Sequence, residues 1–551
     1  MTTRFRFGIA AIAAVLLLAA TGCSKSADSG TSTQGGILRI GATATIDSLN
    51  PFVSQSDYSS VAFEYMYPHL VEHDADLNII PSFATKWETS PDGKTWTFHT
   101  VPGAKWSDGQ PLTAQDAAFT INMMIKFQNG PTGQLGGLVA HMIKAVATDD
   151  NTLVTTYDVS VANVLTQMQG LNIYPQHVWA TLATGDGKQI TSFQNSAPIV
   201  SGGPFMMTKY VQNQLALFAK NPNWWGAKKP IIDGFGFQFF ANDDALVTAL
   251  KTNQVDMIGE ATPPTALGSL QSAGMTVVSA PGVGIKTLII NTNPKKKQHH
   301  ELLNPTVREA FEYAIDRQQI VDTAWLGHAQ LGSSVVTPAS GWKDPTIQPL
   351  PFDIAKGNAL LDSVGYTAGA DGIRVANGQQ MSYDLIFPTE ENGAGDRTFQ
   401  IIQSDFKQIG VQLTQHKMDP AATFTAIAGT DNKYQDFDLA MWNWVLPPDP
   451  DNIMNAMTCA QWGALSDSGY CNPAFDAMYA QQSTLSNVSA RHALINQMQR
   501  VLVNDRPYIV LDYPNVIEAH NPAWTGFVMS PLVGSVNNIS LITLLNVHRV
   551  G

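Results

Sequence analysis

A stretch of aromatic, amide and acidic side chains, FDLAMWNWVLPPDPDN, spans residues 437–452 and contains groups that could contact a ligand. Its centre predicts a strand with the residues Met441, Trp442, Asn443, Trp444 and Val445. In a strand the two tryptophans share one face, and the other three residues share the opposite face. An indole ring stacks well on a sugar or another flat apolar group. Tryptophans are also common in cores, so the second interpretation is that both rings only pack inside the protein.

Motifs that would indicate catalysis are missing from the sequence. No Gly-x-Ser-x-Gly elbow is present to support a serine hydrolase. The glycine-rich residues 130–137 lack the Gly-Lys-Ser/Thr that holds a nucleotide phosphate. No set of cysteines and histidines has the spacing of zinc ligands. The sequence therefore gives no support to hydrolase or ATPase chemistry, and we expect no catalytic residue, no cofactor and no metal.

The N-terminal segment predicts export and a lipid anchor. Two arginines precede the apolar run Phe7 to Ala20, which is too short to span a membrane but fits a signal peptide over residues 1–22. Small residues lead directly to Cys23, as in the lipidated cysteine of bacterial lipoproteins. The alternative is a secretory signal with an unrelated cysteine. Cys23 and a flexible, polar tether make up residues 23–36.

The composition describes a large, acidic, globular protein. The chain has 551 residues, of which 44% are hydrophobic, and a formal net charge of −13. The length that follows the tether is too great for one core and predicts two or three domains. An acidic surface argues against nucleic acid and anionic lipid as partners. We therefore expect contact with a membrane only through the lipid.

Turn, strand and helix signals follow one another between Pro81 and Phe119. Asp92-Gly93 predicts a tight turn, and the alternating residues Thr95 to Val101 predict a half-buried strand behind it. Asp108-Gly109 predicts a second turn. Thr113 lies three residues before an aspartate, as in a capping box, and predicts the start of a helix.

This series resembles the signature segment of the family 5 extracellular solute-binding proteins, the peptide- and nickel-type receptors of bacterial ABC importers. The similarity extends to SGGPF and NPNWW within residues 201–225, and to VREAFEYAIDRQQIV at residues 307–321. It covers nearly all of residues 37–551. The resemblance implies an α/β fold of the periplasmic-binding-protein type, with two lobes and an extra inserted domain. A solute would bind in the cleft between the lobes, and closure would bury it.

The resemblance also implies how the chain is divided. The first lobe would contain residues 37–80, 199–283 and 514–551, the inserted domain residues 81–198, and the second lobe residues 284–513. Two strands would cross between the lobes as hinges. The implied partners are a peptide or another small solute and a permease with its ATPases. We expect a monomer on the outer face of the cytoplasmic membrane, which is the periplasmic side where an outer membrane exists.

In peptide-binding members of this family, the strand that corresponds to residues 437–445 lines the cleft, and an aspartate after it pairs with the α-ammonium of the peptide. Here that position is Leu446 or Pro447, and neither can carry the charge. Asp449 is near enough in sequence to replace the aspartate, or it only shapes the loop. An ammonium that is buried without a partner is costly. An oligosaccharide or another solute without an α-ammonium is therefore the alternative to a peptide.

The other ligand contacts are also implied by the resemblance. Met441, Asn443 and Val445 would face the cleft, and Asp57 and Tyr58 would approach the ligand from the first lobe. The alternative for Asp57 and Tyr58 is a solvated loop. A secreted hydrolase or a sensory protein on the same fold is the alternative of another class, because a fold alone does not determine function.

Two further groups of residues have simple interpretations. Once Cys23 is assigned to the anchor, Cys459 and Cys471 remain as a pair in an exported chain, which predicts a disulfide rather than two separate thiols. Residues 295–300, KKKQHH, look like a basic or metal-binding patch. Their position between Asn293-Pro294 and a helix that begins at Pro305 predicts a solvated loop instead.

Overall fold

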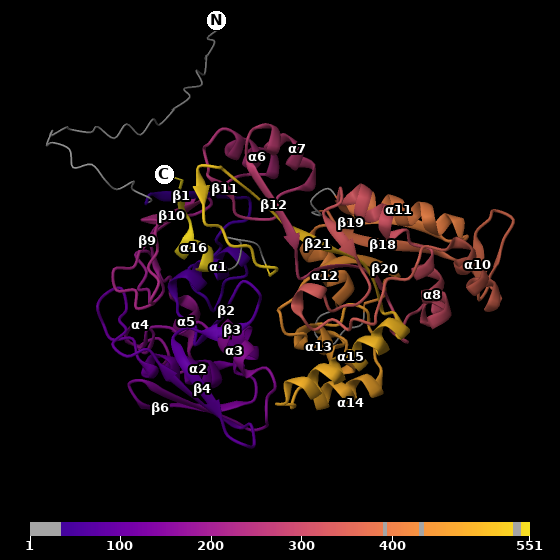
Figure 1. The fold of residues 1–551 in the computed structure, drawn as a ribbon. Coiled ribbons are helices and arrows are strands. Elements are labelled where there is room, and N and C mark those ends of the chain that lie inside the picture. Colours follow the sequence, from indigo (N-terminus) through magenta and orange to yellow (C-terminus); the bar gives the residue numbers. More distant parts are fainter. Residues whose placement is uncertain (1–34, 390–393, 429–434, 533–540, 551) are drawn as a thin grey trace, which may run out of the picture. The chain divides into compact units, whose positions relative to one another are not determined.

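The computed structural model describes residues 35–389, 394–428, 435–532 and 541–550 (Figure 1). The predicted signal peptide, Cys23 and the tether up to residue 34 lie outside these ranges, and so these predictions stay open. None of the helices in the described ranges is long and apolar enough to cross a bilayer.

Twelve strands of the described residues form one sheet. In sheet order, ten of them are β19 (Gln412–Met418), β18 (Ser382–Pro388), β20 (Leu439–Val445), β13 (Gly284–Ile290), β21 (Tyr508–His520), β11 (Met257–Ile258), β1 (Ile37–Ala42), β10 (Gly234–Phe239), β9 (Leu215–Lys220) and β8 (Phe205–Val211). The remaining two, β12 (Thr276–Pro281) and β14 (Ala329–Leu331), also pair with β21. Parallel and antiparallel pairs both occur, since β1 runs parallel to β10 and β13 runs antiparallel to β20.

Strand β21 changes partners along its length. Its first residues pair with β13, up to the pair Lys286 and Asp512, and its last residues pair with β12, from the pair Pro281 and Asn515. The change falls at residues 513–514, where the sequence places the boundary of the second lobe. One continuous strand therefore belongs to both halves of the sheet.

Helices cover both faces of the part of the sheet that contains β18, β20 and β13. On one face, α8 (Pro305–Tyr313), α10 (Ile354–Ser363) and α11 (Ala394–Gln408) share a core with the strand residues Leu288 and Met441. On the other face, α13 (Asp451–Ala456), α14 (Pro473–Gln482) and α15 (Val488–Asp505) pack with Ile289 and Ala440. The alternation of apolar residues along each strand produces these two cores.

A second, four-stranded antiparallel sheet lies within the predicted inserted domain. Its order is β4 (Ala84–Thr89), β5 (Thr95–Thr100), β7 (Thr152–Tyr157) and β6 (Met142–Asp149), and α2 (Ala114–Phe127) packs on β6. The capping box is present. The side chain of Thr113 accepts a hydrogen bond from the backbone N–H of Asp116, and the side chain of Asp116 accepts one from the backbone N–H of Thr113. The strand and the helix start predicted for this segment are therefore confirmed.

The remaining elements are short. The helices are α1 (Asp57–Met66), α3 (Val164–Gly170), α4 (Gln176–Trp179), α5 (Lys188–Ser192), α6 (Asp243–Lys251), α7 (Leu267–Ser272), α9 (Arg317–Gln319), α12 (Pro420–Ala428) and α16 (Leu541–Asn546). The strands are β2 (Val71–His73), β3 (Ile79–Pro81), β15 (Thr367–Ala368), β16 (Arg374–Ala376), β17 (Gln379–Gln380), β22 (Trp524–Thr525) and β23 (His548–Arg549).

Two opposite charges are buried where β21 changes partners. Lys286 on β13 and Asp512 on β21 are in register, and neither has exposed surface. Burial lowers the pKa of Lys286 and raises the pKa of Asp512, and the attraction between the two charges opposes both shifts. Replacing one member of such a pair with an apolar residue lowers the free energy of unfolding more than replacing both, because it leaves a buried charge without a partner.

We expect Lys286→Met to lower the free energy of unfolding by about 3 to 5 kcal/mol at pH 8. The carboxyl left behind keeps a raised pKa, so between about pH 4 and its native pKa the native state binds a proton that the unfolded state has released. The stability of this variant should therefore rise as the pH falls from 8 to 5. Urea unfolding at both pH values measures the change.

The double variant Lys286→Met/Asp512→Asn is the control, because it contains no carboxyl at this position. It should lose less stability than the single variant at pH 8 and should lack the additional pH dependence. Equal pH dependence in the two variants would contradict the assignment.

Candidate functional site

Strand β20 occupies the centre of the predicted binding stretch. Its seven residues, Leu439–Val445, pair with β13 on one side, and Leu439 and Ala440 pair with β18 on the other. Met441 has no exposed surface and belongs to the core, so the expectation that it faces an open cleft is not met in this structure. Asn443 and Val445, on the same face, are exposed, and Val445 exposes 65% of its surface.

The two tryptophans of β20 lie on the opposite face and are half-buried. Trp442 packs against Phe424, with the ring centroids 6.0 Å apart. The indole Nε1 of Trp444 donates a hydrogen bond of 3.1 Å to Oδ2 of Asp467. Each ring therefore has one part fixed by a neighbour and another part that is accessible.

Asp449 lies in the loop after β20 and forms an ion pair with Arg491. Its two carboxylate oxygens accept hydrogen bonds of 2.6 and 2.7 Å from the guanidinium of Arg491. One of them also accepts the backbone N–H of Asp451 at the start of α13. The side chains of this ion pair are 11% and 4% exposed. The charge of Asp449 is thus already balanced, and the carboxylate shapes the loop.

Leu446 and Pro447 stand where the resemblance places an ammonium partner. Leu446 is buried in the apolar core and Pro447 is exposed. Neither side chain offers a charge or a hydrogen-bond acceptor. At Leu446, Pro447 and Asp449, the loop therefore offers an α-ammonium no carboxylate that is not already paired with a cation.

The two residues expected on the first lobe lie at the start of α1. Asp57 is exposed, whereas Tyr58 is buried. The hydroxyl of Tyr58 donates a 2.7 Å hydrogen bond to the carbonyl of Gly259, and its ring meets Phe237 edge-on. Tyr58 is therefore part of the core in this structure, and Asp57 alone reaches solvent.

A polar pair at the ends of parallel strands was missed by the sequence reasoning. Thr43 follows β1 and Glu260 follows β11, which run parallel to each other. Oε1 of Glu260 accepts hydrogen bonds from the backbone N–H of Thr43 at 2.9 Å and from its hydroxyl at 2.8 Å. Ligands of open α/β sheets bind beyond the carboxyl ends of the strands, so this position is suited to a contact.

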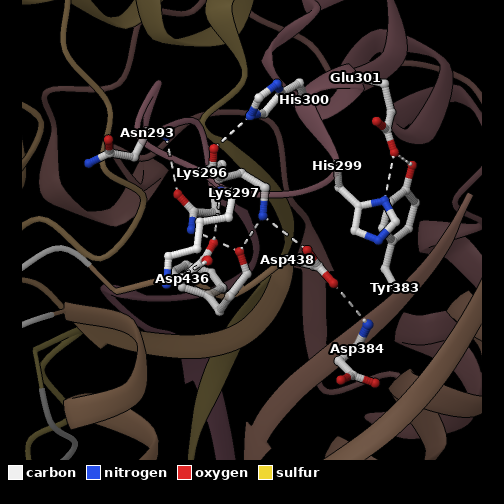
Figure 2. A network of polar contacts seen from close by, with 12 residues as sticks. Asn293, Lys296, Lys297, His299, His300, Glu301, Tyr383, Asp384, Asp436 and Asp438 are labelled. Atoms are coloured by element: carbon white, nitrogen blue, oxygen red, sulfur yellow. Dashed lines mark hydrogen bonds and ion pairs between the residues drawn. The ribbon is translucent and has the colours of Figure 1, made fainter. Parts of the chain in front are cut away.

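The lysine-rich residues 295–300 are only partly solvated, which corrects the prediction of a solvated loop. Figure 2 shows Lys296 directed at Asp438. Its ammonium donates a 2.9 Å hydrogen bond to Oδ1 of Asp438 and a 2.6 Å hydrogen bond to the carbonyl of Phe437. The Lys296 side chain is 1% exposed, whereas the Lys297 side chain is 80% exposed. An aspartate more than a hundred residues further along the chain supplies the counter-charge that permits this burial.

Three residues after Lys296, Nδ1 of His299 donates a 2.9 Å hydrogen bond to Oε1 of Glu301, which also accepts a 3.0 Å bond from the hydroxyl of Tyr383 (Figure 2). The hydrogen bond to Glu301 raises the pKa of His299. In the part of the chain that the structure describes, no group of three or more histidines, cysteines and acidic residues is placed to hold a metal ion.

The structure joins Cys459 and Cys471 in a disulfide with their Cα atoms 4.4 Å apart. The bridge closes the loop that carries Asp467.

A cavity of about 610 Å³ lies elsewhere, between α4, α5 and residues 192–200. Its lining includes Tyr67, Trp179 and Asn195 and no charged side chain. The cavity is therefore separate from the residues that the sequence singles out.

Comparison with known proteins identifies the class. Residues 78–464 match the model of the bacterial extracellular solute-binding proteins, family 5 Middle. The chain therefore belongs to this family of non-catalytic, extracellular substrate-binding components of ABC importers.

The chain is 25% identical to the nickel-binding periplasmic protein of Escherichia coli, over 86% of this chain and 88% of that protein. It is 24% identical to a dipeptide-binding protein of Pseudomonas aeruginosa, over 87% and 90% of the two chains. Its structure is similar to that of the oligopeptide-binding protein AppA from Bacillus subtilis in complex with a nonapeptide, with a TM-score of 0.77, 19% identity and coverage of 95% of this chain and all of that chain. The predicted fold is confirmed.

We expect Lys296→Met to lower the free energy of unfolding by about 3 kcal/mol, because it leaves Asp438 without its cation. Lys297→Met is the matched control, since its exposed pair with Asp436 spans 3.9 Å, and it should cost less than about 0.5 kcal/mol. Urea unfolding followed by circular dichroism measures both. Equal losses in the two variants would show that the burial of Lys296 does not stabilise the protein.

Proposed function

We propose that this protein is the receptor for peptides in an ABC importer. The observation that carries the proposal is the mixed surface at the end of β20. At this strand end the exposed amide of Asn443 and the exposed apolar Val445 lie on one face of β20, and the half-buried indole of Trp444 lies on the other face. An extended peptide, which offers alternating polar backbone groups and apolar side chains, suits a strand end with both kinds of group.

The mechanism that we propose is closure of two lobes around the solute. The support comes from strand β21, which passes from the β13 side of the sheet to the β12 side. A hinge at residues 513–514, between the two pairings, would let the two sides move relative to each other. A closed receptor would present both lobes to a permease, whose ATPases supply the energy. Lipid at Cys23 would hold the receptor at the membrane.

A solute without an α-ammonium is the second candidate, and one specific observation favours it. Asp449, the first acidic residue after the position of the missing ammonium partner, is engaged by Arg491 through both oxygens. A second cation there would compete with a bidentate guanidinium. An N-terminally blocked peptide or an oligosaccharide would make no such demand.

Thermal unfolding of the mature protein with matched probes tests the proposal. The probes are Ala-Ala-Ala, N-acetyl-Ala-Ala-Ala, maltotriose and Ni²⁺ with histidine. A ligand at a hundred times its Kd stabilises the native state by about 2.7 kcal/mol and raises the Tm. We expect both peptides to raise the Tm to a similar extent, because the loop offers no free carboxylate for the ammonium.

The pattern of the Tm shifts separates the candidates. A shift with Ala-Ala-Ala alone would mean that an acidic side chain recognises the free ammonium. A shift with maltotriose alone would replace the peptide assignment with an oligosaccharide. Mass spectrometry of molecules that co-purify with the protein extends the test to longer peptides, and an absence of peptides together with no Tm shift would contradict a peptide receptor.

A further inference from the structure

The buried carboxylate of Asp467 connects two strands of the sheet. Asp467 lies in the loop closed by Cys459 and Cys471 and is 1% exposed. Its Oδ2 accepts the indole N–H of Trp444 on β20, and its Oδ1 accepts the hydroxyl of Tyr508 on β21. One side chain therefore receives a donor from each of two strands.

The loop is fixed by contacts that do not involve Trp444. The carbonyl of Ser468 accepts the backbone N–H of Thr292 at 2.8 Å and the hydroxyl of Thr292 at 3.2 Å. Gly469 has a φ of +61°, and a Cβ at this position would lie 2.5 Å from the Cβ of Asn293. The disulfide joins the two ends of the same loop. The backbone on which Asp467 sits is therefore held against the chain that follows β13.

An ionised carboxylate matches this pair of donors. It has two acceptor oxygens and no donor, whereas an asparagine in its place accepts through one oxygen and presents an N–H₂ to the other donor. Burial raises the pKa of Asp467 to about 7, and the hydrogen bonds from Tyr508 and Trp444 act in the opposite direction. The described residues form no ion pair with Asp467. The site is thus built from two neutral donors around one acid.

Trp444 is the point at which this arrangement meets the surface. It is half-buried and lies between the exposed residues Asn443 and Val445 in sequence, with its ring on the opposite face of β20. A hydrogen bond at Nε1 fixes the rotation of the indole about its side-chain bonds, because the ring can meet Asp467 in one orientation only. The exposed edge of the ring is then presented to a ligand in that orientation.

We propose that Asp467 is a positioning residue that sets the orientation of Trp444 and thereby the shape of the ligand surface at the end of β20. The proposal rests on the proposed function, because that function assigns this surface to the solute. Asp467 itself does not touch the solute, since it is buried beneath the tryptophan and the loop.

The first experiment observes the indole N–H of Trp444 without any ligand. The protein has 12 tryptophans, so the resonance is assigned in ¹⁵N-tryptophan-labelled protein by its loss in Trp444→Phe. In the unaltered protein we expect slow exchange of this N–H with deuterium. We expect Asp467→Asn to shift the resonance and to accelerate its exchange, and Tyr508→Phe, the matched control, to leave both unchanged.

The second experiment measures the Kd for N-acetyl-Ala-Ala-Ala by calorimetry. We expect Asp467→Asn to weaken binding about tenfold, as for loss of one hydrogen bond that orders a contact, and Tyr508→Phe to weaken it less than twofold. An unchanged Trp444 resonance in Asp467→Asn would overturn the proposal, as would a shifted resonance with an unchanged Kd.

Two further outcomes are decisive. If Asp467→Asn does not fold, fast exchange of the Trp444 indole N–H in the unaltered protein overturns the proposal and slow exchange supports it. If the unaltered protein binds none of the probes, the peptide assignment fails, while the resonance of Trp444 in Asp467→Asn still decides whether Asp467 orients the ring.

Discussion

The rest of the structure depends on strand β21, which pairs with β13 along its first half and with β12 along its second half. Residues 508–512 complete the sheet beside β13, and residues 515–520 complete it beside β12. Both cores next to β13 and β20 include residues of this strand. Its backbone hydrogen bonds cannot be replaced locally, because no other described strand reaches both parts of the sheet.

Several buried charges in the part of the fold around β20 have a specific partner. Lys296 meets Asp438, and Arg491 meets Asp449 through both oxygens. Asp467 is balanced by two neutral donors instead. Each arrangement fixes the direction of the side chains involved, because a buried charge tolerates few alternative geometries. The surface at the end of β20 is consequently supported by polar contacts as well as by packing.

The sequence predicts those features of the fold that depend on neighbours in the chain. The capping box at Thr113 and the helix that begins after Asn304 follow from short spacings, and both are present. The family fold follows from a long series of such signals. Burial of Lys296 was not predicted, because the partner, Asp438, lies just before β20 and 142 positions further along the chain.

The candidate site is less predictable for the same reason. Alternation in β20 correctly separates the tryptophans from Asn443 and Val445, yet it does not show that Met441 is covered by helices from other parts of the chain. The pairing of Asp449 with Arg491 spans 42 positions and has no local signal. An acidic residue in a disulfide-closed loop next to a tryptophan-rich strand is the signal by which Asp467 could have been found.

The position of β21 in the chain also determines the order in which the protein can fold. Strand β1 begins at residue 37, and strand β13 begins at residue 284, whereas β21 begins at residue 508. The sheet next to β13 thus stays incomplete until more than nine-tenths of the chain has emerged, and its open strand edges are exposed in the meantime. Contacts so distant in sequence form slowly. A chain exported as an extended thread would therefore be vulnerable to proteases and aggregation until its last strand arrives, and truncations that remove only the C-terminal tenth would leave both parts of the sheet unfinished.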